Sequence, residues 1–379
     1  MINDEMNDIV DRIILELPAY NNNYFPEYEN ASESPVLGSY TCEERDDTLH
    51  VYHTVVQPLI YSIVFLLGIV GNGLLLTVLL QRHACLRITE IYLLHLAVAD
   101  LLLLLGLPFA ITQVLGSWVF GDFLCKVMGL LNRLNLVCGS LLLACIGFDR
   151  YLAVVHAISS LGSRQPRVVH LTCGLLWLFS LVVGMPNIVF LSVVSTDHGS
   201  SQLQCHFHNH HIHAFNWTIA SRFLTHLLCF FLPLVVMSYC YIAVVITLRR
   251  SQQSLQKQSA IRLAMLVTGV FCLCWLPYNL ALLVHSLVQL NILTEESCEA
   301  RRALAQSLVL TESLGYMHSC LNPILYAFVG VRFRSDLLQL LAKWGLGSAC
   351  GPLLRVGGRR RVSVSDAATT STTTTNQYI

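Results

Sequence analysis

The sequence places amide and carboxylate side chains inside long apolar stretches, where they could hold a cation or hydrogen-bond to one another. Asp100 stands in the second such stretch, and Asn72 and Asn135 stand in the first and third. Ser319 and Asn322 stand in the last one. Polar groups of this kind are costly in a membrane interior, so each is a candidate functional residue. Their oxygens could bind a sodium ion, or the groups could form a network between helices without an ion, and the residues leave both possibilities open.

A second set of residues could switch a helix bundle between two shapes. It combines a charged pair at the end of the third apolar stretch with proline breaks in the sixth and seventh, and Pro233 is expected to break the fifth as well. Proline removes a helical hydrogen bond and bends the helix, so these positions predict hinges in a bundle with two stable arrangements. Taken alone, the charged pair could also be explained by an arginine that extends to the membrane surface. The candidate switch residues are Asp149, Arg150, Tyr151, Trp275, Pro277, Asn322, Pro323 and Tyr326.

Seven apolar stretches are each long enough to cross a lipid bilayer, which needs about 20 residues in a helix. They are continuous, whereas the strands of a membrane barrel would alternate apolar and polar residues. Only helices or closed barrels satisfy the backbone in lipid, so the sequence predicts an all-α membrane protein with a bundle of seven transmembrane helices. The predicted spans are Pro58–Leu80, Ile91–Leu115, Cys125–Val155, Val168–Leu191, Phe223–Leu248, Ile261–Leu290 and Leu304–Phe328.

Differences in composition predict four parts of the chain. Residues 1–54 form an acidic extracellular tail, and residues 55–329 form the bundle. Residues 330–342 mix arginines with leucines at helical spacing and predict a short amphipathic eighth helix on the membrane surface. Residues 343–379 end in serines and threonines and predict a disordered cytoplasmic tail. The modification candidates in that tail are Cys350 for a palmitoyl anchor and Ser363, Ser365, Thr369 and Thr370 for phosphorylation.

The charges are unevenly distributed along a chain whose formal net charge is +0. The 379 residues are 54% hydrophobic and 12% charged, whereas soluble proteins have about 25% charged residues. Many acidic residues precede Val51, and most basic residues lie in alternate loops and in the C-terminal tail. The positive-inside rule then predicts an extracellular N-terminus and a cytoplasmic C-terminus in a plasma-membrane protein. The acidic tail suits a basic extracellular partner, although a solvated, disordered tail would have the same composition.

Four of the 14 cysteines lie on the predicted outer side of the membrane. An oxidising compartment favours disulfides there. Four cysteines allow three pairings, and the sequence alone does not select one of them. These cysteines are Cys42, Cys125, Cys205 and Cys298.

No constellation of residues predicts catalysis, so we expect a protein that is not an enzyme and has no cofactor apart from the sodium ion considered above. The histidines of the spans are scattered and lack the spacing of metal ligands. A retinal-binding photoreceptor would need a lysine in the seventh span, which contains none. A transporter would show a repeated half, and the sequence has no such internal symmetry.

Taken in order, these motifs resemble those of the rhodopsin-like G-protein-coupled receptors, over about residues 55–341. The resemblance implies an agonist site on the outer side. It also implies a heterotrimeric G protein on the inner side, which Arg150 engages when the sixth helix swings outward. Asp100, Asn72 and Asn135 would form a sodium pocket, in which Gly139 stands where the family usually has serine. The matching residues are Gly71-Asn72, Leu96–Asp100, Cys125, Asp149-Arg150-Tyr151, Trp177, Pro233, Cys274–Pro277 and Asn322–Tyr326.

Within that family the sequence is most similar to the chemokine receptors, in particular those for CXC chemokines. Asp149–Ala157 resembles their intracellular motif, Trp118–Gly121 resembles their first extracellular loop, and Glu312 falls on their acidic position in the seventh helix. The resemblance implies the disulfides Cys125–Cys205 and Cys42–Cys298. It also implies that chemokine binding is converted into G-protein signalling of the Gi type, calcium mobilisation and chemotaxis of leukocytes, in particular B cells. A scavenging receptor, or a receptor for another peptide, is the alternative.

The same resemblance implies that the ligand is first captured and then inserted. The acidic tail, with tyrosines that suit sulfation, would hold a basic chemokine, and Glu312 would pair with the terminal amine of its inserted segment. Arg133 could equally pair with a helix carbonyl or with Glu312. The other implied partners are arrestin, receptor kinases, membrane lipid and a second receptor copy, and nucleic acid is not among them. The ligand candidates are Tyr20, Tyr24, Tyr28, Asp197, Asn132, Arg133, Arg222 and Glu312, and Asn30 is the glycosylation candidate.

Overall fold

The computed structural model describes residues 50–82, 86–156, 165–195, 203–207, 214–250, 255–293 and 297–344. The chain divides into two units, Met1–Glu44 and Arg45–Ile379, and every described residue belongs to the second. Several predictions therefore fall on residues outside the described ranges. These residues are Tyr20, Tyr24, Tyr28, Asn30, Cys42, Asp197, Cys350, Ser363, Ser365, Thr369 and Thr370.

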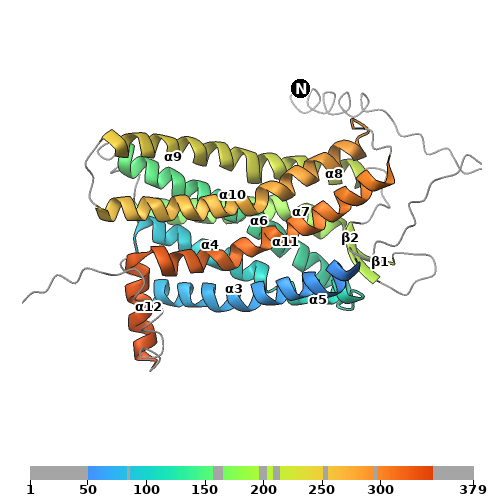
Figure 1. Cartoon of the computed structure of the whole chain (residues 1–379), viewed down its shortest axis with the longest axis horizontal. Helices are drawn as coiled ribbons and strands as arrows, with labels where there is room; N and C mark the ends of the chain where they lie inside the picture. Colours follow the sequence, from blue (N-terminus) through green and yellow to red (C-terminus); the bar gives the residue numbers. More distant parts are fainter. Residues whose placement is uncertain are drawn as a thin grey trace, which may run out of the picture. The chain divides into compact units, whose positions relative to one another are not determined.

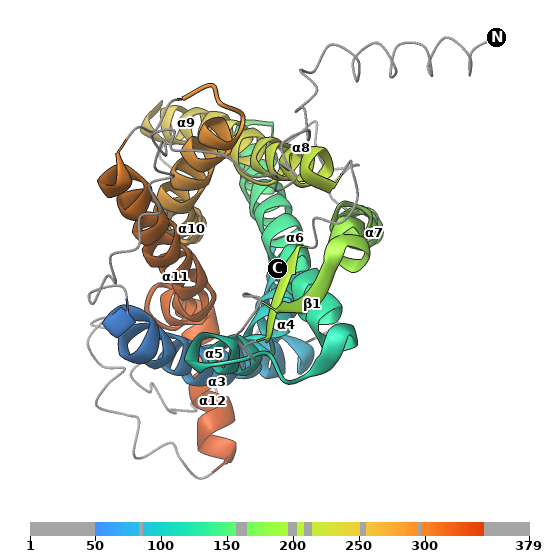
Figure 2. The same ribbon diagram turned by 90° about the vertical axis from the view of Figure 1, so that its right-hand side faces the viewer.

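Long helices form a bundle in which each apolar stretch of the sequence has become a helical rod (Figure 1). Figure 2 looks along the rods and shows them arranged around a common centre. The predicted spans agree with the helices to within a few residues at most ends. In chain order the elements are η1 (Tyr52–Val56), α3 (Gln57–Leu80), α4 (Ile88–Leu104), α5 (Leu107–Leu115), α6 (Gly121–Val155), α7 (Pro166–Phe190), α8 (Ala214–His226), η3 (Leu227–Phe231), α9 (Leu232–Arg250), α10 (Leu255–Gln289), α11 (Cys298–Val329) and α12 (Val331–Lys343).

The outward faces of the helices are apolar, as lipid requires. Leu171 is 64% exposed, Val235 66% and Leu273 73%, although all three are large hydrophobic side chains. Within the described residues, six helical segments are long and apolar enough to cross a membrane. The seventh rod, α11, is not one of the six, since it carries polar side chains such as Glu312 and Asn322.

Two spans are interrupted where proline or glycine weakens the backbone hydrogen bonding of the helix. The second span divides into α4 and α5, with Gly106 capping α5 and Pro108 in its first turn. The fifth span contains the π-helical turn η3 directly before Pro233, the proline expected to break it. Proline supplies no N–H for the preceding turn, and a π-turn is a common local adjustment to such a disruption.

The predicted amphipathic helix is present as α12 at one end of the bundle, and two short strands lie at the other end (Figure 1). Leu337 and Leu340 of α12 are buried against Val78 of α3. Arg82 also pairs with Asp336 at 2.6 Å. The strands β1 (Leu191–Ser195) and β2 (Leu203–Phe207) form an antiparallel pair.

Candidate functional site

Asp100 lies at the centre of a buried polar network that joins three helices. Its side chain is fully buried, and its two carboxylate oxygens accept hydrogen bonds from Asn135 of α6 and Asn322 of α11, at 3.0 and 2.9 Å. The imidazole of His318 is also near, with Nε2 3.6 Å from the carboxylate. Donors on two sides offset much of the cost of a buried carboxylate. The structure thus brings Asp100, Asn135 and Asn322 together, as the sequence suggested.

Asn72 and Ser319 belong to the same region but contact Asp100 less directly than expected. The amide nitrogen of Asn72 donates to the backbone oxygens of Gly68 and Ser319, at 3.0 and 2.9 Å. The hydroxyl of Ser319 donates to the carbonyl of Tyr316 at 2.8 Å. The side chains of Asn72 and Ser319 therefore donate to backbone atoms, because helical side chains can bond to nearby backbone oxygens.

The oxygens of this network suit a hard cation. Among the described residues, the side-chain oxygens of Asn72 and Asn322 are buried without a hydrogen-bond partner. Oxygen ligands are those that hard cations prefer. With the carboxylate of Asp100, these amide oxygens are the groups that would hold a sodium ion, whose charge would offset that of the carboxylate.

A tryptophan of α10 is connected to this network through a histidine of α11. Trp275 donates its indole N–H to Nδ1 of His318 at 3.1 Å, and its ring packs edge-on against Tyr316. Pro277 follows within the same helix, and the side chain of Asn279 donates to the carbonyl of Trp275 at 2.8 Å. His318 was not among the predicted site residues, because the histidines of the spans are scattered along the sequence, although its place directly before Ser319 in an apolar helix was a visible signal.

The charged pair at the C-terminal end of α6 forms contacts within that helix and with the second span. Asp149 and Arg150 form an ion pair at 2.6 Å. Thr89 of α4 donates to Asp149 at 3.0 Å and accepts a hydrogen bond from Arg150. Tyr151 contacts His156 at 2.9 Å and packs against Tyr239. In this arrangement the guanidinium of Arg150 is held against its own helix and α4.

Two buried polar atoms at this end of the bundle have no hydrogen-bond partner among the described residues. They are Nε of Arg150 and the hydroxyl of Tyr326. An unsatisfied buried polar group costs about 1–3 kcal/mol. A second arrangement of the helices that supplied partners to these atoms would recover that cost. Pro323, which would lie close to a Cβ on Gly71, stands inside α11 three residues before Tyr326.

A cavity of about 510 Å³ lies between the helices near the strands. Glu312, half-buried in its wall, accepts a hydrogen bond from Tyr316 at 3.0 Å, and Asn132 donates to the same hydroxyl at 3.0 Å. Trp275 lines the same space, so a ligand in this cavity would lie against the chain that runs through His318 to Asp100.

A second cavity of about 190 Å³ adjoins the first, because Arg133, Leu136 and Tyr278 line both. Arg133 donates to the hydroxyl of Thr225 at 2.6 Å, so its alternative pairing with Glu312 is not the one that the structure adopts. The hydroxyl of Thr225 can accept this bond because its own proton goes to the carbonyl of Ser221, at 2.7 Å.

Arg222 lines the second cavity from α8 and reaches α10. Its guanidinium donates to the side-chain oxygen of Gln289 at 2.7 Å and lies 3.3 Å from Nδ1 of His285. The predicted ligand residues therefore divide between two spaces. Glu312 and Asn132 face the first cavity, Arg222 faces the second, and Arg133 faces both.

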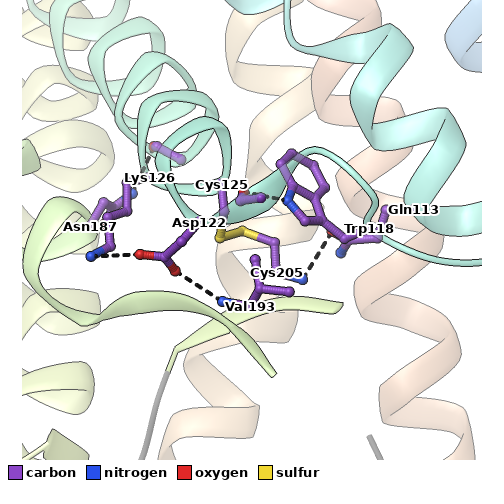
Figure 3. The surroundings of a disulfide bond; sticks show 10 residues. Gln113, Trp118, Asp122, Cys125, Lys126, Asn187, Val193 and Cys205 are labelled. Atoms are coloured by element: carbon purple, nitrogen blue, oxygen red, sulfur yellow. Dashed lines mark hydrogen bonds and ion pairs between the residues drawn. A yellow bond between two sulfur atoms is a disulfide. The ribbon is translucent and has the colours of Figure 1, made fainter. Parts of the chain in front are cut away.

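The strands are linked to the third helix by a disulfide (Figure 3), whose two cysteines line the first cavity. A disulfide joins Cys125 of α6 to Cys205 of β2, which confirms one of the pairings that the resemblance implied. Asp122 accepts from the backbone of Val193 at 3.1 Å and pairs with Lys126 at 3.0 Å. Cys298 is also disulfide-bonded, and its expected partner Cys42 lies outside the described residues.

Comparison with known proteins shows which family has this architecture. The family model described as "7 transmembrane receptor (rhodopsin family)" matches residues 71–326. The C-X-C chemokine receptor type 5 of Rattus norvegicus is 42% identical over 350 residues, covering 92% of this chain and 93% of that receptor. The type 5 receptor of Homo sapiens is 40% identical over 349 residues, with the same coverage. The C-X-C chemokine receptor type 2 of Homo sapiens is 39% identical over 321 residues, covering 84% of this chain and 87% of that receptor.

Short stretches of the sequence also point to particular types. Ser221–Leu224 resembles the fifth CXC receptor and Gly315–His318 resembles the third, so the residues favour type 5 with type 3 as the runner-up. The similarity to the type 5 receptors agrees with the first choice. The seven rods, the amphipathic α12 and the Cys125–Cys205 disulfide match the expected receptor architecture. The chain therefore belongs to the rhodopsin family of seven-transmembrane receptors and, within it, to the C-X-C chemokine receptors.

Proposed function

We propose that this receptor binds a basic CXC chemokine on its outer side and transmits the binding to a heterotrimeric G protein of the Gi type. The observation that carries the proposal is a continuous connection through the bundle. Trp275 lines the outer cavity and donates to His318, whose second nitrogen lies 3.6 Å from Asp100. A ligand that moves the indole therefore acts on the network that links α4, α6 and α11.

Signalling requires that the ligand favour one arrangement of the helices over the other. An inserted chemokine segment whose terminal amine pairs with Glu312 would compete with Tyr316 for that carboxylate. The tyrosine hydroxyl and its ring, which packs against Trp275, would then rearrange. At the inner end, Arg150 would leave Asp149 and Thr89 to meet the G protein.

The remaining parts of the proposal concern the cellular setting. The receptor lies in the plasma membrane with its N-terminus outside, where sulfated Tyr20, Tyr24 and Tyr28, together with Asp197, capture the chemokine body. The signal produces calcium mobilisation and B-cell chemotaxis. Receptor kinases and arrestin act on the serine- and threonine-rich tail, α12 rests on membrane lipid, and receptor copies associate. Sodium binds at Asp100 as an allosteric ion.

A scavenging receptor is the second candidate function, because it would bind the same ligands. The intact Asp149-Arg150-Tyr151 motif favours signalling, since scavenging receptors frequently carry altered versions of it.

The test is a calcium and cAMP assay in cells that express the receptor, using a panel of CXC chemokines. We expect at least one chemokine to lower cAMP and release calcium. Arg150→Ala should bind that chemokine but lose most of the signal, because the group that meets the G protein is gone. A full signal from Arg150→Ala would contradict the mechanism, and binding without any signal from the unaltered receptor would favour scavenging.

A further inference from the structure

Three polar side chains of the first rod form a hydrogen-bonded series that ends at the first cavity. His53 lies in η1, and Gln57 and Tyr61 follow it in α3 at intervals of four residues. Nδ1 of His53 is 2.7 Å from the amide oxygen of Gln57, and the amide nitrogen of Gln57 is 2.9 Å from the hydroxyl oxygen of Tyr61. Gln57 and Tyr61 are buried and line the first cavity. We call these three residues the relay.

Tyr61 connects the relay to the residues that would meet the ligand. Its ring packs edge-on against that of Tyr316, with 5.5 Å between the ring centroids, and Tyr316 donates to Glu312. On α11, Ser313 and Glu312 are neighbours of the Tyr61 hydroxyl. The proton of Ser313 goes to the carbonyl of Val309, at 3.0 Å, so the oxygen of Ser313 is left to accept. The direction of the Tyr61 proton therefore decides what this hydroxyl offers to the ligand site.

The amide of Gln57 can satisfy both of its neighbours in two orientations. In the orientation that the structure shows, its oxygen accepts from Nδ1 of His53 and its nitrogen donates to Tyr61, whose own proton is then directed to α11. In the reverse orientation, Tyr61 donates to the amide oxygen, and the amide nitrogen donates to an unprotonated Nδ1 of His53. Neutral histidine allows both orientations, because either ring nitrogen can carry the proton. An imidazolium carries protons on both nitrogens, so it allows only the first orientation.

His53 is the member of the relay whose residue type changes charge near neutral pH, and it is only half-buried. Its segment η1 packs against α3 and α5. Within the described residues, the titratable groups near it are Tyr52, whose ring centroid is 6.1 Å away, and Tyr61 of α3. Helix α5 carries no titratable residue, α11 contributes Glu312 across the first cavity, and His50 precedes η1. A proton on His53 therefore acts on the relay with few competing charges.

We propose that His53 and Gln57 are positioning residues of the ligand site, which weaken chemokine binding in acid by turning the hydroxyl of Tyr61. A terminal amine in its charged form carries only hydrogen-bond donors, so it needs oxygen lone pairs. In the reverse orientation, the Tyr61 proton points to Gln57 and the lone pairs of its oxygen are left for an amine beside Glu312. A protonated His53 excludes this orientation, and the Tyr61 proton then competes with the amine for the acceptors of α11.

This inference rests on the proposed function, since it concerns the chemokine amine that pairs with Glu312, and it adds that the extracellular pH adjusts the affinity. The two proposals can fail separately. If no chemokine of the panel binds at pH 7.5, the proposed function fails, and the relay fails with it. If a chemokine binds and signals, but the pH dependence of its affinity is the same with and without His53, the relay fails and the proposed function stands.

The experiment measures equilibrium binding of an activating chemokine from the panel to cells that express the receptor, at pH 7.5 and at pH 5.5. On going to pH 5.5, the affinity for the unaltered receptor should fall by roughly three- to tenfold more than the affinity for His53→Gln, which is about the value of one hydrogen bond. Glutamine can still contact Gln57 but binds no proton. Histidines of the chemokine titrate in both measurements, so the comparison isolates the residue of the receptor.

Gln57→Met separates the relay from a direct effect of charge. This variant keeps the imidazole of His53 but removes its connection to Tyr61, so its binding should have the same reduced pH dependence as that of His53→Gln. His50→Gln is the matched control, because it removes an exposed imidazole three residues earlier that is not part of the relay. It should keep the full pH dependence of the unaltered receptor.

An N-terminal epitope tag reports whether each variant reaches the cell surface. His53→Asn takes the place of His53→Gln if the latter does not, since asparagine also binds no proton. Full pH dependence in Gln57→Met would show that the charge of His53 acts through space and would overturn the relay. Equal loss of pH dependence in His50→Gln and His53→Gln would overturn it as well, because any imidazole at this end of the bundle would then have the same effect.

Discussion

Gly315 lets the sixth and seventh rods approach closely at the indole of Trp275. A Cβ at this position would lie 2.8 Å from the ring carbon Cζ3, closer than real contacts allow. The ring is 3% exposed and is held by its hydrogen bond to His318, so it has little freedom to move. Gly315→Ala should therefore destabilise the receptor by about 1–3 kcal/mol through overpacking. The measurement is the melting temperature of the purified receptor in detergent, which should fall.

Gly174 provides the matched control for that substitution. It also lies inside a helix, α7, but a Cβ there meets nothing within 4 Å. Gly174→Ala should leave the stability unchanged or raise it by up to about 1 kcal/mol, because alanine is the better helix former. If both variants melted alike, close packing at Trp275 would not be the function of Gly315.

The sequence predicted which residues are buried and polar, but not how they pair. Asp100, Asn135 and Asn322 were recognised because polar groups stand out in apolar stretches. The choice of partners depends on side-chain rotamers and on the rotation of each helix, which periodicity does not determine. Asn72 consequently donates to the carbonyl of Ser319, and Arg133 selects Thr225 in place of Glu312.

At the scale of elements, α12 is held to the bundle by apolar packing more than by charge. Leu340 is 2% exposed, whereas the ion pair of Arg82 with Asp336 is partly solvated, with side chains 31% and 17% exposed. Leu340→Ala should cost about 2–5 kcal/mol. Asp336→Asn should cost less than about 1 kcal/mol, because water screens the pair. Amide hydrogen exchange over 331–343, followed by mass spectrometry, measures the release of the helix.

Gln339→Ala is the control for α12, because this side chain is exposed. It should leave the exchange of the helix unchanged. Faster exchange in Asp336→Asn than in Leu340→Ala would show that the ion pair, and not the apolar contact, fastens α12.

Helix bounds were predictable because lipid imposes a minimum length of apolar residues, and the breaks within helices were less so. Pro233 was expected to disrupt the fifth span, and η3 precedes it. The division of the second span at Gly106 and the π-turn η1 were not predicted, since both depend on local hydrogen bonds that a hydropathy pattern does not contain. The first helix also begins at Tyr52, within the segment predicted as tail.

At the scale of the molecule, the polarity of α11 follows from its place in the bundle. Its polar residues His318, Ser319 and Asn322 are buried against other helices, so they need not meet lipid. A hydropathy criterion therefore misses this rod, although the family match extends to residue 326 and the other six segments meet it. With α11 included, the number of membrane-crossing rods is odd. The chain therefore enters and leaves the bundle on opposite sides of the membrane.

Basic residues gather at the end of the bundle that carries α12. This end should face the cytoplasm, and the end with the strands should face outward. Single cysteines can test the orientation. Val119 is 69% exposed between α5 and α6, and Gln81 is exposed where α3 ends. The basic residues are Arg82, Arg87, Arg167, Arg249 and Arg250.

A membrane-impermeant maleimide should label Val119→Cys on intact cells, and Gln81→Cys only after the cells are permeabilised. The unaltered receptor gives the background labelling of the native cysteines. Within the described residues, the cysteines that are not in a disulfide are buried or half-buried. The physical reason is that moving the arginine-rich loops across the membrane is far costlier than moving the strand end. Labelling of Gln81→Cys on intact cells would show that the bundle has the opposite orientation in the membrane. The cavities would then open to the cytoplasm, where no secreted chemokine could reach them.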